Sequence, residues 1–225
     1  MSRLRILTAA LLLIPGLQLQ AVIVDGIAIA VGNKVITRSD IEQRIRLTAL
    51  QNGETPDFSL ASRKLAAQRL IDQRLIEKEM EVGRFPHTPE ARARELLANY
   101  EKTSYGSDPA ALRRALEKYG LTEKDLEEDL ARQADLLTFL NLRFRPAVNV
   151  DDREVQAYFD QKVSPEEKKQ GLNALRTQIE QLLANDRADR DLDEWLKDQR
   201  GRTRIDYVDK ELAPAERKIG GGAAN

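Results

Sequence analysis

The strongest constraint in this sequence of 225 residues is a repeated alternation of helix-start and helix-stop patterns. A start is a short polar residue that can cap free backbone N–H groups, followed by an acidic residue or a proline in the first turn. A stop is a glycine that can adopt a left-handed conformation, or a proline that interrupts the helix. Apolar residues between these patterns recur at helical spacing, so the sequence predicts a mainly α-helical chain.

These patterns delimit five helices between residues 39 and 146. The expected starts are the capping box Ser39-Asp40-Ile41-Glu42, then Leu60, Thr88-Pro89, Asp108-Pro109 and Thr122. The expected stops are Asn52-Gly53, Gly83, Gly120 and Pro146. The residues expected on buried helix faces are Ile41, Ile45, Leu50, Ile71, Leu75, Ile76, Met80, Val82, Leu112, Leu116, Tyr119, Leu126, Leu130, Leu137 and Leu140.

Two more helices are expected in the last third of the chain. Asp151 to Glu154 starts the first, whose apolar residues are Val155, Tyr158 and Phe159. The second is long and ends at Gly201, and its start at Ser164-Pro165-Glu166-Glu167 combines a capping box with a first-turn proline. The apolar residues expected in this long helix are Leu172, Leu175, Ile179, Leu182, Leu192, Trp195 and Leu196.

Short strands are expected at both ends of the helical region. Residues 22–36 are rich in β-formers on either side of Gly32-Asn33-Lys34, which is typical of a hairpin turn. Residues 203–208 have the composition of one more strand. Because a strand needs a partner, we expect it to pair with the hairpin and bring the chain ends together. The predicted fold class is a mainly α, multi-helix module with an N-terminal β-hairpin paired to a C-terminal strand.

The first 21 residues have the order of regions found in a secretory signal peptide. Arg3 and Arg5 precede the apolar run from Ile6 to Leu17, and a short uncharged segment then ends at Ala21. The apolar run is shorter than the roughly 20 residues that span a bilayer. We therefore expect export with cleavage near Ala21; the alternative interpretation is a buried N-terminal helix.

The charge balance and the lack of cysteine exclude several classes of function. The 36 basic residues nearly balance the 37 acidic ones, whereas a protein that mainly binds nucleic acid favours a strongly basic face. The chain has no cysteine, which excludes thiol chemistry and cysteine-ligated metals. Charged residues make up 32% of the chain and aromatic residues 5%, a composition typical of helices with much exposed surface and a thin core.

The sequence contains no recognisable catalytic or cofactor-binding motif. His87, the only histidine, is expected in a surface loop. The acidic groups Asp151-Asp152 and Glu127-Glu128-Asp129 are expected at helix starts or on solvated helix faces. Trp195 and Phe159 could form a ligand platform, but their helical spacing favours a role in helix packing. We therefore assign no catalytic, cofactor-binding or metal-binding residues.

Several segments of the chain resemble the SurA family of periplasmic chaperones. They are Val24–Ile41, Leu65–Val82, Tyr119–Thr122 with Leu126, Val148–Val155 with Tyr158-Phe159, and Leu192–Leu196 with Arg204–Tyr207. The first, VDGIAIAVGNKVITRSDI, is similar to the family's opening stretch, and the resemblance covers residues 22 to about 210. The family pattern is broken after Lys162, where Ser164 and the C-terminal helix follow directly. An isomerase domain of the parvulin type, roughly 90–100 residues, has no room there.

The resemblance implies a chaperone module at 22–210. With the segments read from the residues themselves, the expected organisation is a signal peptide at 1–21, this module, and a flexible tail at 211–225. The module has an N-terminal part, 22–162, and a C-terminal helix and strand, 164–210. The implied function is an ATP-independent periplasmic chaperone that binds unfolded or outer-membrane-bound client proteins.

The same resemblance implies that the chain is not an enzyme. Together with the charge balance and the lack of cofactor motifs, it leads us to expect no cofactor, no nucleic acid and no small-molecule substrate, and no residue is assigned to client binding. The alternatives are a structural or scaffolding envelope protein that binds one folded partner and, less favoured, a peptidyl-prolyl isomerase. A homodimer remains an open alternative for the assembly.

Overall fold

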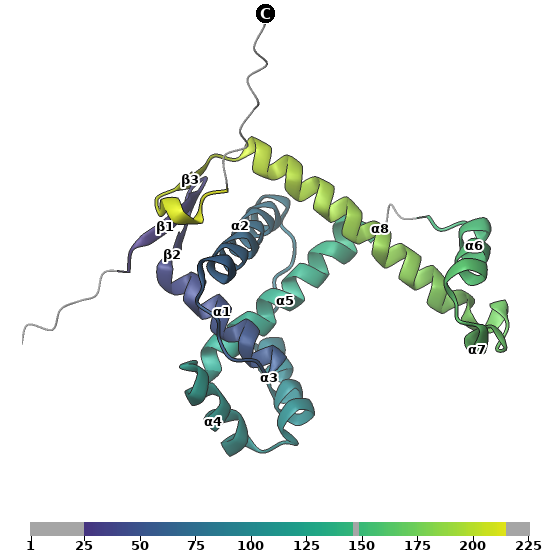
Figure 1. The fold of residues 1–225 in the computed structure, drawn as a ribbon, viewed down its shortest axis with the longest axis horizontal. Helices are drawn as coiled ribbons and strands as arrows, with labels where there is room; N and C mark the ends of the chain where they lie inside the picture. The colour runs from purple at the N-terminus through teal and green to yellow at the C-terminus, as the bar shows by residue number, and fades with distance from the viewer. Residues whose placement is uncertain (1–24, 146–148, 215–225) are drawn as a thin grey trace, which may run out of the picture.

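The computed structural model describes residues 25–145 and 149–214, and within these ranges it is mainly helical (Figure 1). The expected signal peptide, the start of the first expected strand and most of the expected tail lie outside the described residues. The helices are α1 (Arg38–Asn52), α2 (Leu60–Gly83), α3 (Glu90–Tyr105), α4 (Pro109–Tyr119), α5 (Glu123–Arg143), α6 (Asp152–Lys162), α7 (Pro165–Lys168) and α8 (Leu172–Arg202). The strands are β1 (Ile27–Val31), β2 (Lys34–Thr37) and β3 (Ile205–Tyr207), and a 3-10 turn, η2, covers Lys210–Leu212. This confirms the fold class that the sequence predicts.

The three strands form one antiparallel sheet in the order β2-β1-β3. β1 and β2 form the expected hairpin, whose turn contains Gly32 with a φ of 59°. β3 pairs with the other edge of β1, where Ile29 lies opposite Tyr207. The sheet therefore joins the two ends of the described chain, as the sequence predicts.

Buried apolar residues form two clusters. The larger one joins the sheet to α2, to the first half of α1 and to the C-terminal parts of α5 and α8. The smaller one joins the second half of α1 to α4 and the start of α5, through residues such as Leu47 and Leu112. α6, α7 and the N-terminal half of α8 project away from both clusters (Figure 1). One end of α8 is thus held in the core while the other end extends from it.

An aromatic group holds α8 against α5. Phe139 is fully buried, and its ring centroid lies 5.3 Å from Phe85, 5.6 Å from Phe144 and 5.4 Å from Trp195. This confirms the packing role expected for Trp195. Leu137, which was expected to be buried, is 60% exposed, because two residues correspond to about 200° around a helix and Phe139 takes the core side.

Three helix starts differ from those expected. The capping box of α1 is formed by Thr37 and Asp40, so the expected box at Ser39–Glu42 is wrong and Ser39 lies inside the helix. α3 has Pro89 rather than the expected Thr88 at its N-cap, and the backbone N–H of Thr88 instead donates to Asp135 on α5. The box at Ser164–Glu167 forms as expected but opens only the single turn of α7. α8 begins separately after Gly171, which has a φ of 82°.

Two helix ends also differ from those expected. Gly83 is the last residue of α2, and the left-handed residue that caps the helix is Arg84, with a φ of 54°. Val82, expected on the buried face, is exposed. Gly201 lies inside α8 rather than ending it. The core also reaches past position 210, where the tail was expected to begin, because Leu212 is buried in it.

Among the described helices, none combines the length and the apolar character that crossing a bilayer requires.

The placement of Gly83 leads to a stability prediction. A Cβ added at Gly83 would lie 2.5 Å from Cε2 of Phe85, so Gly83→Ala must displace this ring from Phe139. We expect the substitution to lower the free energy of unfolding by about 1–3 kcal/mol. Gly201→Ala is the matched control, because nothing lies within 4 Å of an added Cβ there. The control should gain about 0.5–1 kcal/mol. Urea unfolding measures the change in unfolding free energy for both variants. Equal changes would contradict a clash between the added Cβ and Phe85.

Candidate functional site

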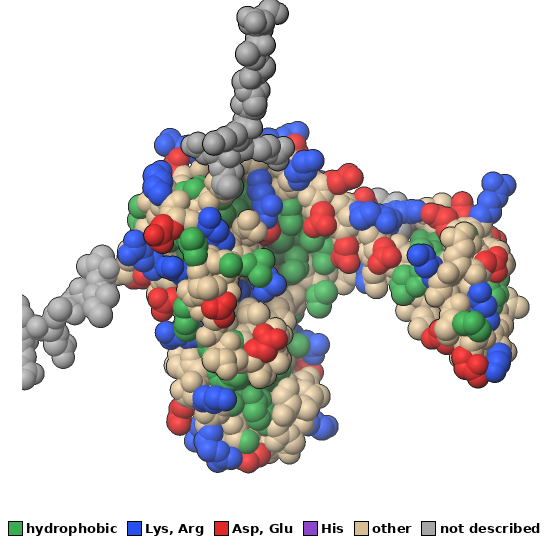
Figure 2. All heavy atoms as spheres, viewed as in Figure 1, with side chains coloured by type: hydrophobic (Ala, Val, Ile, Leu, Met, Phe, Trp, Pro, Cys, Tyr) green, Lys and Arg blue, Asp and Glu red, His purple; other side chains and the backbone are tan. Residues whose placement is uncertain are grey.

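A solvent-open cleft of about 460 Å³ lies between α2, α5 and α8. Figure 2 shows hydrophobic side chains on the concave side where α8 leaves the rest of the molecule. The apolar residues that line the cleft are Ile76, Met80, Leu136, Leu192 and Leu196, and we call them the cleft floor. The polar residues that line it are Arg44, Arg69, Asp72, Gln73, Glu77, Glu81, His87, Asp129, Arg132, Gln133 and Asp135. Its volume lies within the range of small-molecule and peptide pockets.

One continuous face of α2 forms the longest wall of the cleft. Its lining residues, from Arg69 to Glu81, follow one another at alternating spacings of three and one, as residues on one face of a helix do. The apolar members of this face, Ile76 and Met80, are also part of the larger core cluster. The cleft floor is therefore the exposed edge of the core rather than a separate pocket.

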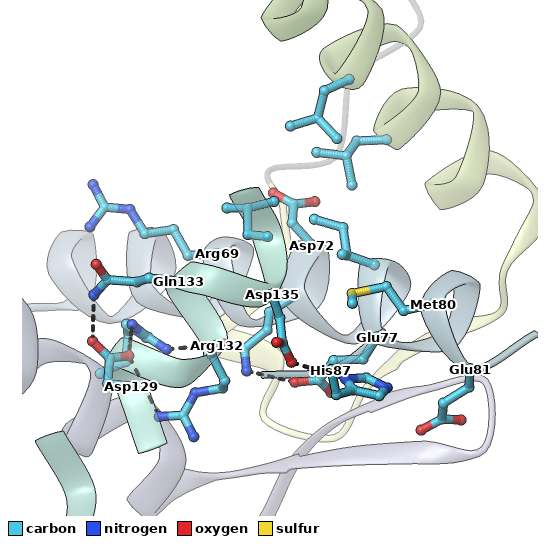
Figure 3. A pocket seen from close by; sticks show the side chains of 16 residues that line it. Arg69, Asp72, Glu77, Met80, Glu81, His87, Asp129, Arg132, Gln133 and Asp135 are labelled. Atoms are coloured by element: carbon cyan, nitrogen blue, oxygen red, sulfur yellow. Dashed lines mark hydrogen bonds and ion pairs between the residues drawn. The ribbon is translucent and has the colours of Figure 1, made fainter. Parts of the chain in front are cut away.

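A buried carboxylate organises one side of the cleft (Figure 3). Asp129 of α5 is 0% exposed, and its Oδ1 accepts a hydrogen bond from Nη1 of Arg44 at 2.7 Å. Its Oδ2 accepts from Nε2 of Gln51 at 2.9 Å and from Nε2 of Gln133 at 2.8 Å. Arg44 also donates to Oε1 of Gln73 at 3.0 Å, so the network ties α1 and α2 to α5.

The sequence-based expectation for this carboxylate was wrong. Glu127-Glu128-Asp129 was expected on a solvated face, and Glu128 does lie at the surface, but Asp129 does not. Asp129 follows Leu126 by three residues and precedes Leu136 by seven, so it lies on the buried stripe of α5. That spacing is the one feature of the sequence that could have identified it.

A second carboxylate, Asp72 on α2, lies where α8 meets the cleft. Its Oδ2 accepts a hydrogen bond from Nη2 of Arg200 at 2.5 Å. Burial raises the pKa of Asp72 above its ordinary value of 3.8, although the hydrogen bond from Arg200 acts in the opposite direction. Asp193 adds a smaller repulsive contribution that also raises this pKa. The pair is the charged contact between α2 and α8 beside the cleft floor.

His87 lies in the exposed connection between α2 and α3, as expected from the sequence, and also at one end of the cleft. Its Nδ1 is 2.9 Å from Oδ2 of Asp135, and Oδ1 of Asp135 accepts from the backbone N–H of Thr88 at 2.6 Å. Asp135 thus fixes the start of α3 against α5.

The other residues singled out from the sequence lie away from the cleft. Asp151 caps α6, as expected, and Asp152 pairs with Arg176 of α8 at 2.5 Å. Phe159 of α6 is half-buried, with the ammonium of Lys168 6.0 Å from its ring centroid. Trp195 belongs to the aromatic group behind the cleft floor.

The cleft has the chemistry of a binding surface with an apolar floor and a charged rim. In residues 25–145 and 149–214, no group of three or more His, Asp or Glu side chains is arranged to hold a metal ion. An apolar floor of this kind accepts apolar side chains of a bound molecule, while the surrounding charges orient it.

A comparison of the sequence with models of known protein families finds no match. A comparison with curated proteins finds no similar sequence.

The buried network predicts a large and localised effect on stability. Asp129→Ala leaves Arg44, whose side chain is only 16% exposed, without its carboxylate partner. We expect the free energy of unfolding to fall by about 3–5 kcal/mol, as for other broken buried ion pairs. Glu128→Ala is the neighbouring control, since its half-exposed pair with Arg132 contributes about 1 kcal/mol or less. Urea unfolding of both variants measures these losses of unfolding free energy. Similar losses in the two variants would contradict a special role of the buried carboxylate.

The raised pKa of Asp72 predicts how the free energy of unfolding changes with pH. The ionised carboxylate is less favourable in the folded protein than in the unfolded chain. Its contribution to stability is therefore greatest at low pH and falls as the pH rises through its titration. Asp72→Asn stays neutral, so its stability relative to the unmodified protein should increase between about pH 3 and about pH 7. Unfolding free energies across this range measure the difference, and the opposite trend would show that the Arg200 pair dominates.

Proposed function

We propose that this protein is an exported, ATP-independent chaperone that holds unfolded envelope proteins in the cleft between α2, α5 and α8. The observation that carries the proposal is the cleft floor, where five apolar side chains line an open cleft with a charged rim. Leu136 and Leu192 are the partly exposed members of this floor, and Ile76, Met80 and Leu196 form its buried base. The proposal includes membership of a SurA-like family without the isomerase domain, and a location in the periplasm. The sequence resemblance supports both.

The physical basis is reversible burial of apolar surface. An unfolded chain exposes apolar side chains, and covering each one on the cleft floor gains a modest amount of free energy. Because ordering the bound chain has an entropic cost, the net affinity stays moderate and the chain can be released without nucleotide hydrolysis. Binding lowers the concentration of free unfolded chain by mass action, which slows its aggregation.

The arrangement of the helices supports this function. α6, α7 and the first half of α8 project from the core and give the molecule a concave side, and the cleft opens where this projection begins (Figures 1 and 2). A long unfolded chain can therefore contact the cleft and the projecting helices together. Many weak contacts of this kind suit clients that differ in sequence.

A scaffolding protein that binds one folded envelope partner is the second candidate. It predicts a single saturable complex with a native protein and no response to unfolded chains. A prolyl isomerase is the third, and for the chaperone we expect only background rates in a proline-isomerisation assay. Crosslinking in the periplasm, followed by identification of the captured proteins, distinguishes these functions.

Suppression of aggregation tests the proposal directly. An outer-membrane β-barrel protein is diluted from urea into buffer with the chain from Val22 onward, which includes every described residue, and light scattering is followed. We expect suppression at a several-fold molar excess, and none at that ratio would contradict the proposal. Replacing Leu136 and Leu192 of the cleft floor together by Gln should raise the half-effective concentration about fivefold or more.

The matched control replaces two exposed leucines of α5 that lie outside the cleft. Leu137 and Leu142 on α5 are both more than half exposed and do not line the cleft. Their joint replacement by Gln makes the same chemical change, and suppression should be unaltered. Equal losses in the two double variants would show that general surface hydrophobicity, rather than the cleft, holds the client.

A further inference from the structure

The two ends of the α2 wall of the cleft carry opposite charges, and Asp72, which lies between them, is paired with Arg200. On α2, Arg69 lies at one end of the lining face, and Glu77 and Glu81 lie at the other. Figure 3 shows the same separation, with Arg69 on one side and Glu77, Glu81 and His87 on the other. Twelve residues separate Arg69 from Glu81, which corresponds to about 18 Å along a helix.

On α5, the charged lining residues are Asp129, which is buried and paired with Arg44, and then Arg132 and Asp135. Arg132, 3.5 Å from Asp129, lies at the end marked by Arg69, and Asp135 lies beside His87 at the other end (Figure 3). The apolar cleft floor therefore lies between a basic end and an acidic end.

The charged residues at the two ends of the cleft differ in whether they already form ion pairs within the protein. Within the described residues, Arg69 is exposed and has no ion-pair partner. Glu81 pairs with Lys34 at 2.9 Å, but both side chains are well exposed, and such a pair is readily exchanged for another partner. Asp72, between the two ends, is already paired with Arg200. The residues best placed to select a ligand are thus Arg69 and Glu81.

We propose that the cleft selects a short extended polypeptide segment with an apolar centre, an acidic residue at the Arg69 end and a basic residue at the Glu81 end. This inference rests on the proposed function and names the class of client segment. A length of about 18 Å accommodates about five residues of extended chain at 3.3 Å per residue. Apolar contacts supply most of the affinity, and charge complementarity supplies the selection among segments.

Three labelled peptides test the selection. Each has blocked ends and the same apolar centre, with one Lys and one Glu as flanks, with two Lys, or with two Glu. Binding to the purified chain is measured by fluorescence anisotropy at low salt. We expect the mixed peptide to bind roughly three- to tenfold more tightly than either like-charged peptide. At about 1 M salt the difference should largely disappear while binding itself remains, because charges are screened within about 3 Å.

Charge reversals identify the residues responsible. Arg69→Glu should transfer the preference to the peptide with two Lys flanks, and Glu81→Lys should transfer it to the peptide with two Glu flanks. Lys78→Glu and Glu79→Lys are the matched controls, since they make the same charge changes on α2 outside the cleft. These controls should keep the preference for the mixed peptide. Circular dichroism verifies folding of each variant, and Arg69→Gln, which should only weaken the preference, replaces Arg69→Glu if that variant does not fold.

The outcomes separate this inference from the proposed function. Equal binding of the three peptides, or an unchanged ranking in the two reversal variants, overturns the charge selection but leaves a cleft that binds apolar segments. Failure to bind any of the three, together with unimpeded aggregation of the β-barrel protein, overturns the proposed function itself.

Discussion

The antiparallel pairing of β3 with β1 joins the two ends of the described chain and fixes where α8 lies. The backbone N–H of Gly32 donates to the carbonyl of Arg204 at 2.9 Å, just after α8 ends. With its end fixed there, α8 crosses α2 and α5, where Trp195 packs against Phe139. The cleft exists because this helix is held at one end and projects at the other.

The polar groups around the cleft serve two different purposes. Asp129 and Arg44 are withdrawn from solvent, and they fix α1, α2 and α5 relative to one another. Arg69 and Glu81 are exposed, and in the binding that we propose they contact the charged flanks of a client segment. A rigid apolar floor with adjustable charges at its ends suits a protein that binds many segments of similar character.

The core beneath the cleft is thin, which is consistent with the composition of the chain. Only 5% of the residues are aromatic, and Phe139, Phe144, Phe85 and Trp195 are concentrated at the single point where α8 meets α5. Much of the remaining surface is charged and paired within helices, such as Arg94 with Glu90. The region that stabilises the fold therefore lies directly behind the cleft to which we assign client binding.

The sequence by itself determined the helical class, the hairpin with its C-terminal partner strand, and most helix boundaries, because caps and apolar spacing act within a few residues. Only the tertiary structure decided which side of α5 is buried, since Asp129 and Phe139 replace Leu137 there through contacts with α1 and α8. It also decided that Arg84 rather than Gly83 adopts the left-handed conformation that caps α2, and it placed the ring of Phe85 beside Gly83. The cleft is likewise a tertiary feature, because its lining residues come from helices far apart in the chain, and their positions depend on packing rather than on local preference.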